Sequence, residues 1–149
     1  MRATESAALE QFAAQCARGW LVGGCLRDAL LGLAVRDLDL VVDGDPLALA
    51  RAVADAGGYA LAVLRPDAAR LVPRGAAGTW LDISRLRGPT IAADLALRDF
   101  RINALALPLE RRAAFLATVS APADGAALVA LEAALLDPLG GLADLRARR

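Results

Sequence analysis

The spacing of apolar residues along the chain predicts both helices and strands. Apolar positions recur at helical spacing in residues 4–17 and 47–56, which predicts two amphipathic helices. Short apolar runs bounded by glycine, proline or charged residues predict strands at residues 20–22, 37–42, 59–64, 69–73 and 79–86. Because these strands alternate with helical segments, the pattern alone leaves open both a parallel doubly wound sheet and a mixed α+β sheet.

A pair of glycines follows the first predicted strand and precedes a short predicted helix at residues 25–31. Gly23 and Gly24 have no Cβ, so an anion can approach the main chain closely, and the N–H groups at the helix start favour negative charge there. Arg27, one turn into the helix, adds a guanidinium, and we expect Asp28 to brace the turn through a salt bridge. By itself this pattern is a weak signal, because a Gly-Gly pair before a helix most often forms a simple turn.

Two aspartates lie two residues apart in the apolar run DLDLVV. Side chains alternate between the faces of a strand, so Asp37 and Asp39 share one face, while Leu38, Leu40 and Val42 point into a core. The two aspartate Cα atoms then lie about 6.6 Å apart, close enough to hold a pair of metal ions about 4 Å apart. Such ions clamp the attacking and leaving oxygens of a phosphoryl transfer, and carboxylate oxygens suit Mg²⁺. The alternative is a solvated pair on an exposed face.

Three further aspartates follow this pair along the chain. Asp82 interrupts the apolar run TWLDI, the position expected for a third metal ligand or for a base that accepts the proton of an attacking hydroxyl. The alternative for Asp82 is an exposed polar residue on an edge strand. Asp43 lies about 13 Å beyond Asp39 along the strand, too far to share its metal. Asp45 is the expected N-cap of the helix at residues 47–56.

Four motifs occur in an order that resembles a known enzyme family. They are GGCLRDALLG, RDLDLVVDGDP, LRDFRINALAL and LLDPLGGLADL. They are similar to the catalytic head domain of the bacterial-type tRNA nucleotidyltransferases (CCA-adding enzymes) and poly(A) polymerases, within the DNA polymerase β-like nucleotidyltransferase superfamily. The resemblance covers residues 21–145 and implies one head domain over residues 1–149. It also implies an α+β fold with a mixed, largely antiparallel sheet of about five strands, helices on one face, and the aspartate pair near a sheet edge.

The resemblance implies roles for residues of the third motif. Arg98 is expected to contact the sugar or phosphate of a nucleotide, and Asp99 to orient it. Asn103 matches the asparagine that precedes the family's small apolar run. Two positions differ from the family, since Leu97 stands where another arginine is usual and Arg101 where threonine is usual. Without the resemblance, Arg98 and Asp99 would be an ordinary ion pair.

Together these residues predict a metal-dependent nucleotidyltransferase. Asp37 and Asp39 would bind two Mg²⁺ ions, and Gly23, Gly24 and Arg27 would hold the triphosphate of CTP or ATP. The 3′-hydroxyl of an RNA, expected to be a tRNA, would attack the α-phosphorus, and pyrophosphate would leave. Catalysis of this kind depends mostly on positioning and charge neutralisation, so few reactive side chains are needed.

Three regions depart from the family pattern. Only residues 88–93 separate LDISRLR from DLALRDF, where relatives often carry a longer loop tied to addition of the terminal A, so the short loop resembles enzymes that add C only. Residues 110–132 replace a brief turn; residues 124–136 look helical, and the sequence suggests no function for them. The chain ends at Arg149, before the neck, body and tail domains that choose the base and hold tRNA in the family. Three alternatives stay open: a fragment of a longer protein, a minimal domain that works with a separate chain, or a domain that has lost the choice of base.

Composition narrows the class of protein. The 17 basic residues are all arginine and are balanced by 17 acidic ones, so the net charge of zero gives no overall attraction for nucleic acid. The absence of histidine excludes Ser-His-Asp and Cys-His catalysis and the usual zinc sites. The two cysteines, Cys16 and Cys25, indicate a reducing compartment. With no signal peptide and no apolar stretch that could span a bilayer, we expect a cytoplasmic protein without a membrane partner.

Two other functions are compatible with this sequence. A binding or regulatory module could keep the nucleotidyltransferase fold and bind nucleotide with little or no turnover. The neutral charge and the altered arginine motif favour that alternative, whereas the intact aspartate pair opposes it, since adjacent carboxylates are costly to keep. A stand-alone transferase acting on a protein or a small molecule would differ only in its acceptor, which the sequence does not identify.

Overall fold

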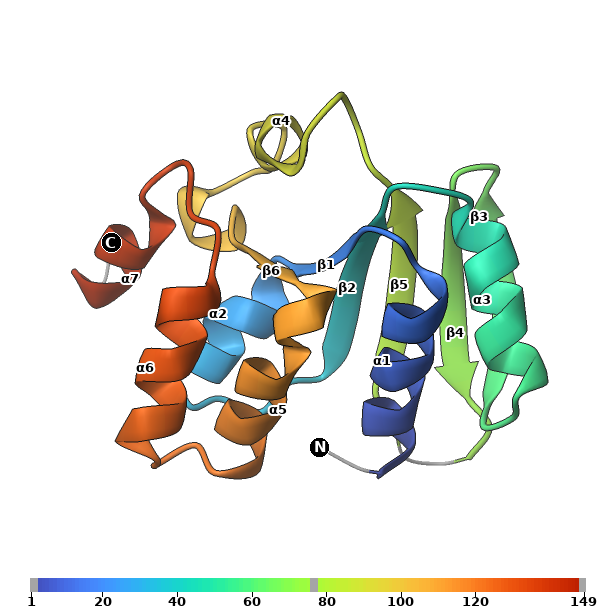
Figure 1. The fold of residues 1–149 in the computed structure, drawn as a ribbon, viewed down its shortest axis with the longest axis horizontal. Helices are drawn as coiled ribbons and strands as arrows, with labels where there is room; N and C mark the ends of the chain where they lie inside the picture. The colour runs from blue at the N-terminus through green and yellow to red at the C-terminus, as the bar shows by residue number, and fades with distance from the viewer. Residues whose placement is uncertain (1–2, 76–77, 148–149) are drawn as a thin grey trace.

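A computed structural model describes residues 3–75 and 78–147, which form one sheet packed against a layer of helices (Figure 1). The strands are β1 (Gly19–Val22), β2 (Asp37–Val42), β3 (Tyr59–Arg65), β4 (Ala68–Pro73), β5 (Trp80–Arg85) and β6 (Ala106–Pro108). The α-helices are α1 (Ala3–Gln15), α2 (Gly24–Leu30), α3 (Pro46–Asp55), α4 (Ile91–Leu95), α5 (Arg112–Ser120), α6 (Gly125–Ala134) and α7 (Gly141–Arg146). Two 3₁₀ turns complete the set, η1 (Arg101–Asn103) and η2 (Leu109–Arg111).

The strand order places the aspartate strand inside the sheet. The order is β3-β4-β5-β2-β1-β6. Strands β2 and β5 run parallel and the other neighbouring pairs are antiparallel, which confirms the mixed, largely antiparallel sheet. The expectation that the aspartate pair lies near a sheet edge is wrong, because β2 lies between β5 and β1. The apolar pattern also does not predict β6, whose three residues are too few to show an alternation.

Helices α1, α2, α3, α5 and α6 cover one face of the sheet (Figure 1). Leu38, Leu40 and Val42 point into this layer and are at most 1% exposed, as the alternation along β2 predicts. Asp45 caps α3, as predicted, and accepts hydrogen bonds from two first-turn N–H groups at 2.9 and 3.2 Å. Most helices therefore lie on one face, and their packing fixes which way the side chains of β2 point.

A smaller group of elements covers part of the opposite face. Helix α4 and the turn η1 lie there, and Leu95 and Ala104 meet Trp20, Val22 and Val41 in a second buried cluster. Val41 belongs to this cluster because it alternates with the residues of β2 that enter the main core. The cluster anchors the segment between α4 and β6 above β1 and β2.

Residues 110–132, for which the sequence suggests no function, contribute helices α5 and α6 to the main helical layer. Helix α6 confirms the helix predicted at residues 124–136, and Asp124 caps it by accepting hydrogen bonds from two first-turn N–H groups. Phe115 of α5 and Leu131 of α6 are fully buried. Helix α5 packs against α2, and an ion pair between Arg112 and Glu10 joins α5 to α1. The segment thus supports the helix that begins at the glycine pair.

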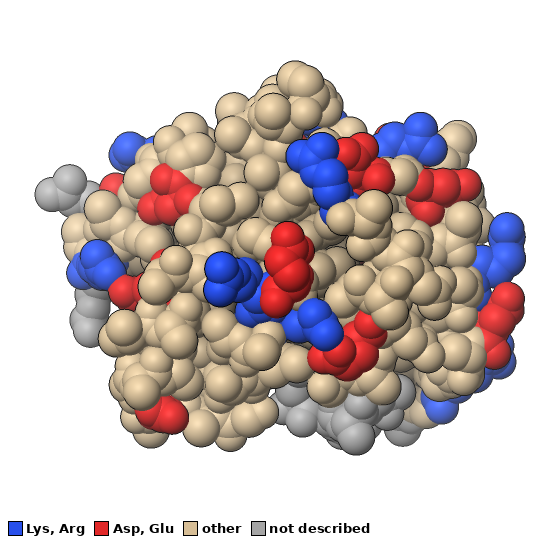
Figure 2. Space-filling view, in the orientation of Figure 1, with Lys and Arg blue, Asp and Glu red and all other residues tan. Residues whose placement is uncertain are grey.

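Charged side chains of both signs are interspersed over the helical face (Figure 2). Within the described residues, this face shows no extended region of a single sign, which agrees with the net charge of zero. Among the described residues, no helix is long and apolar enough to cross a bilayer.

Candidate active site

A row of charged residues crosses the sheet on the face opposite the main helical layer. Asp39 of β2 lies in register with Asp82 of β5, and Asp82 lies in register with Arg70 of β4. Neighbouring strands are about 4.8 Å apart, so these three side chains lie next to one another. Asp37 precedes Asp39 by two residues and therefore shares its face. The structure thus brings the three predicted carboxylates together, in the interior of the sheet.

The surroundings of Asp39 disfavour its negative charge. Burial, followed by the negative charges of Asp37 and Asp82, raises the pKa of Asp39 to about 6. The positive charges of Arg98 and Arg70 oppose this shift. A carboxylate in this setting is stabilised by any additional cation that approaches it.

Asp82 is tied to a neighbouring arginine. Arg70 donates two hydrogen bonds to it, from Nε to Oδ1 at 2.6 Å and from Nη2 to Oδ2 at 2.7 Å. The alternative of an edge-strand residue is wrong, because β5 lies between β4 and β2. Asp82 therefore lies where a third carboxylate was expected, with both its oxygens bound to Arg70.

The oxygen donors of the row fit a hard divalent cation. Carboxylate oxygens are the ligands that Mg²⁺ and Ca²⁺ prefer. Over the described ranges, no group of three or more Cys, Asp or Glu side chains forms a complete metal-ligand set. With Asp82 bound to Arg70, the side chains left for a cation are those of Asp37 and Asp39.

The glycine turn lies directly beside the aspartate strand. Gly23 has φ +78° and ψ −139°, a conformation that side chains disfavour, and its N–H donates to the Leu105 carbonyl at 3.2 Å. A methyl group placed at Gly23 would lie 3.3 Å from Asp39 Oδ2 and 3.5 Å from Arg98 Nη1. The residue therefore separates a carboxylate from a guanidinium, and it does so without a side chain of its own.

Arg27 connects the first and third motifs. It donates from Nε to Asp28 Oδ1 at 2.8 Å, which confirms the predicted salt bridge, and from Nη1 to Asn103 Oδ1 at 2.8 Å. Helix α2 and the turn η1 are thereby joined through a side-chain hydrogen bond. The two partners hold the guanidinium of Arg27 between α2 and η1.

Arg98 is held by Asp94, a buried carboxylate that the sequence analysis did not single out. Asp94 is 1% exposed and accepts hydrogen bonds from Arg98 Nε at 3.2 Å and from the N–H and Nε of Arg87 at 3.0 and 3.1 Å. Burial alone would raise the pKa of Asp94, but the hydrogen bonds from Arg87 and the charges of both arginines outweigh it and lower that pKa. The spacing of four residues between Asp94 and Arg98 was the available signal.

A cavity of about 340 Å³ opens beside the glycine turn. Its lining consists of Gly23, Gly24, Asp39, Arg87, Leu97, Arg98, Asp99 and Asn103. Six of the nine predicted site residues therefore line one cavity. Of the others, Arg27 binds Asn103, and Asp37 and Asp82 extend the charged row. Leu97 is 62% exposed and places an apolar side chain where the family usually has arginine.

The fourth motif supports the turn that carries Asn103. Asp137 caps α7 by accepting hydrogen bonds from the Gly141 and Leu142 N–H groups at 2.7 and 3.0 Å. A methyl group at Gly141 would lie 2.2 Å from the carbonyl oxygen of Arg101, so the absence of a side chain lets α7 pack directly on η1. Arg101, a position where the family usually has threonine, also forms an ion pair with α7. Helix α7 thus holds in place the turn η1, whose residue Asn103 lines the cavity.

Comparison with known proteins agrees with this geometry. Residues 19–90 match the Poly A polymerase head domain. The chain belongs to this family. The match includes the first two motifs, and the resemblance inferred from all four is confirmed.

Relatives of this head domain are longer proteins. The chain is 45% identical over 131 residues to the CC-adding tRNA nucleotidyltransferase of Geobacter sulfurreducens. The aligned region covers 87% of this chain and 25% of that protein. The chain is 40% identical over 104 residues to the A-adding tRNA nucleotidyltransferase of Halalkalibacterium halodurans. That aligned region covers 60% of this chain and 24% of that protein. A solved structure of a tRNA-processing enzyme in its apo form has a TM-score of 0.70 at 30% identity and covers 98% of this chain and 35% of that one. The chain spans about a quarter of these two relatives.

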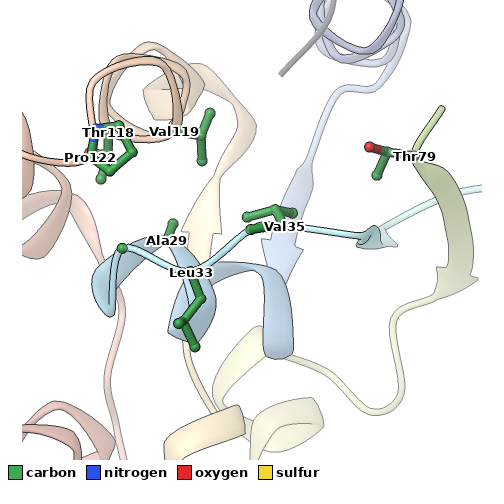
Figure 3. A pocket seen from close by; sticks show the side chains of 9 residues that line it. Ala29, Leu33, Val35, Thr79, Thr118, Val119 and Pro122 are labelled. Atoms are coloured by element: carbon green, nitrogen blue, oxygen red, sulfur yellow. The ribbon is translucent and has the colours of Figure 1, made fainter. Parts of the chain in front are cut away.

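A second cavity in the head domain, of about 370 Å³, has a different character. It is lined mainly by apolar side chains of α2, the following loop and α5, with the hydroxyl of Thr79 at one side (Figure 3). It contains none of the predicted site residues. The charged cavity at Gly23 is therefore the candidate active site of the head domain.

We expect Gly23→Ala to lower the free energy of unfolding by about 1–3 kcal/mol, because the new side chain must adopt a disfavoured backbone conformation. The added methyl group would also enter the space between Asp39 and Arg98, so nucleotide affinity should fall. Urea denaturation and titration with CTP in the presence of Mg²⁺ measure the two effects. Gly24→Ala is the matched control, since Gly24 begins α2 without a positive φ, and we expect it to change stability by less than about 1 kcal/mol. Equal destabilisation by both variants would contradict this account.

We expect Asp39→Asn to raise the free energy of unfolding of the metal-free head domain by about 1–2 kcal/mol at pH 7, with allowance for partial exposure. The pKa of Asp39 is about 6 in the folded protein, above its ordinary value of 3.8, so ionisation destabilises the fold as pH rises through this range. The gain should therefore disappear near pH 4. Denaturation in EDTA at several pH values measures it.

Asp43→Asn provides the control for this prediction. Asp43 forms an exposed ion pair with Arg18 at 3.1 Å, which contributes at most about 1 kcal/mol. We expect this variant to be neutral or slightly less stable. If Asp39→Asn is also destabilising at pH 7, the electrostatic interpretation of Asp39 is wrong.

Proposed function

We propose that this chain is the catalytic head of a tRNA nucleotidyltransferase, which transfers CMP from CTP to the 3′ end of tRNA and releases pyrophosphate. The observation that carries the proposal is the junction at Gly23, where Asp39 and Arg98 face each other across a backbone without a side chain. A metal-binding carboxylate and a phosphate-binding guanidinium at one turn suit a nucleoside triphosphate. The names of the relatives, CC-adding and A-adding tRNA nucleotidyltransferase, support the same reaction.

Asp37 and Asp39 would hold Mg²⁺ in this reaction. Their oxygens are suitable ligands, and the raised pKa of Asp39 reflects a site that gains from added positive charge. When bound, Mg²⁺ neutralises charge on the phosphates and makes the attacking hydroxyl more acidic. Asp82 is the candidate for a third catalytic carboxylate, since Arg70 holds it beside Asp39.

The residues of the chain have separable tasks in the proposed transfer. A bond forms between the 3′ oxygen of the RNA and the α-phosphorus, the bond from that phosphorus to pyrophosphate breaks, and the hydroxyl proton passes to a site carboxylate. Gly23 and Gly24 admit the triphosphate to the main chain, and Arg98 offsets its charge. Arg27 keeps Asn103 at the cavity wall, where it and Asp99 would contact the nucleotide.

We propose CTP as the preferred nucleotide because the connection between β5 and α4 is short. It consists of residues 86–90, in the region where a longer loop resembles enzymes that add the terminal A. The CC-adding relative from Geobacter sulfurreducens also matches more of the chain than the A-adding relative does. ATP is the second candidate and belongs in the same assay.

We also propose that a further segment or a separate chain holds the body of the tRNA. The chain carries no net charge, so its own attraction for phosphates is weak. Its relatives are about four times as long, which leaves ample chain for that task in those proteins. A reaction on tRNA fits the cytoplasmic location expected from the sequence.

The test is a transfer assay with labelled CTP or ATP, Mg²⁺, and tRNA transcripts that end before the 3′ CCA, after its first C or after both. We expect label from CTP on the first two transcripts and little from ATP on any of them. Omission of Mg²⁺ should abolish labelling. Absence of labelled RNA under all conditions, from protein that melts cooperatively and binds CTP, would point either to the binding module or to a head that needs the further segment to act on tRNA.

A further inference from the structure

A tryptophan that is 47% exposed lies directly beside the carboxylates of the candidate site. Trp80 is the first residue of β5 and lies in register with Asp37 of the parallel neighbour β2. The alternation of side chains places it on the same face as Asp82 and the aspartate pair. The guanidinium of Arg70 lies 4.8 Å from the centroid of the indole ring.

Arg70 holds the indole in a fixed position. The arginine is itself fixed by its two hydrogen bonds to Asp82, at 2.6 and 2.7 Å. A guanidinium over an indole is an attractive cation–π contact. One face of the ring is thereby supported, while almost half of the Trp80 surface remains open to solvent. An aromatic ring held in this way is a preformed surface on which another aromatic ring can stack.

The position of Trp80 relative to the cavity indicates which substrate supplies the aromatic ring that stacks on it. The cavity follows β1 at Gly23, the aspartates lie on β2, and Trp80 lies on β5, on the other side of β2. In a phosphoryl transfer the attacking and leaving oxygens lie in line on opposite sides of the phosphorus. With the triphosphate in the cavity on the β1 side, the attacking hydroxyl approaches from the β5 side.

We propose that Trp80 stacks on the 3′-terminal nucleoside of the acceptor RNA and so places its 3′-hydroxyl at the aspartate pair. The inference rests on the proposed function and identifies where its second substrate binds. Every base has an aromatic face, so such a contact accepts RNAs that differ in their last nucleotide. Because Asp82 offsets the charge of Arg70, the contribution of Trp80 depends on stacking and is only weakly sensitive to salt.

Three substitutions at Trp80 test the inference by steady-state kinetics. Trp80→Phe keeps an aromatic ring, Trp80→Leu keeps apolar bulk without a ring, and Trp80→Ala removes both. We expect kcat/KM for the tRNA transcript lacking CCA to fall about tenfold or more in the Leu and Ala variants and only slightly in the Phe variant. The KM for CTP at saturating RNA should not change. Leu64→Ala, at an apolar position on β3 that is 51% exposed, is the control and should match the parent chain.

A binding measurement that needs no turnover gives an independent test. Trp20, the other tryptophan, is 7% exposed, so quenching of fluorescence by acrylamide reports mainly on Trp80. We expect the transcript lacking CCA to protect Trp80 from acrylamide, and the same RNA with its 3′ end paired to a complementary oligonucleotide to protect it much less. The Trp80→Phe variant supplies the background signal.

The outcomes separate this inference from the proposed function. Protection by the free 3′ end without any transfer would support Trp80 as an RNA contact and count only against transfer by this chain alone. Normal transfer with equal kcat/KM in the Leu, Ala and Phe variants would overturn the inference alone. Protection by CTP and Mg²⁺ in the absence of RNA would also overturn it, because the indole would then stack on the nucleotide.

Discussion

Replacement of both Asp37 and Asp39 by asparagine is expected to lower the rate of nucleotide transfer at least about a thousandfold, which corresponds to about 4 kcal/mol of transition-state stabilisation. Asparagine keeps the size of each side chain and removes the two charges that would hold a cation. The aspartates lie on the face of β2 opposite Leu38 and Leu40, outside the main core. The loss should therefore appear in catalysis. Single-turnover addition of CMP to a tRNA transcript, at saturating Mg²⁺, measures it.

Thermal melting shows whether such a loss is catalytic or structural. We expect the double variant to melt at or above the temperature of the parent chain, since Asp39 ionises with difficulty where it lies. Mg²⁺ should raise the melting temperature of the parent chain and not that of the variant. Asp43→Asn, which removes a charge just beyond the same strand, should leave transfer intact. A double variant that retains more than about a tenth of the activity would show that the pair is not the metal site.

Most of the candidate site could be predicted because its residues lie in short local motifs. The glycine pair, DLD and LRDFRIN each have a spacing that places their chemical groups on one turn or one strand face. The alternation in β2 correctly separated Asp39 from the buried Leu38 and Leu40. Resemblance to the family then brought the motifs together, and six of the predicted residues line one cavity.

The parts that escaped prediction depend on how distant strands pair. Arg70 and Asp82 become neighbours only through the antiparallel register of β4 with β5, and Trp80 meets Asp37 only through the parallel register of β5 with β2. No spacing along the chain encodes either contact. The interior position of β2 is of the same kind, because strand order arises from the whole sheet.

Asp94 escaped prediction for another reason. It lies in a five-residue helix, where one polar residue ordinarily faces solvent, and its burial depends on the loop from β5 closing over it. Arg87 on that loop and Arg98 after the helix approach it from two sides. The Asp94 carboxylate therefore holds Arg87 and Arg98, the two arginines that form one wall of the cavity, without lining the cavity itself.

Replacement of Asp94 by asparagine is expected to lower the free energy of unfolding by about 2–4 kcal/mol, below the usual cost of a fully buried pair because Arg87 is half exposed. Asparagine has one acceptor oxygen and no charge, so the guanidinium of Arg98 loses its counterion. Since Arg98 lies beside Gly23 and Asp39, its displacement should also raise the KM for CTP. Chemical denaturation and initial rates at varied CTP measure the two effects.

The pH dependence of stability separates an ionic role of Asp94 from simple packing. Its pKa is lowered in the folded protein, so the stability that it contributes is complete above the ordinary value of 3.8 and is lost as pH falls through the lower folded value. The difference between the parent chain and Asp94→Asn should therefore be full at pH 7 and shrink below pH 4. Asp67→Asn, which removes an exposed partner of Arg65, should change stability by less than about 1 kcal/mol. If the cost of Asp94→Asn is the same at pH 3 as at pH 7, the two arginines are held by packing, and the charge of Asp94 does not organise the wall.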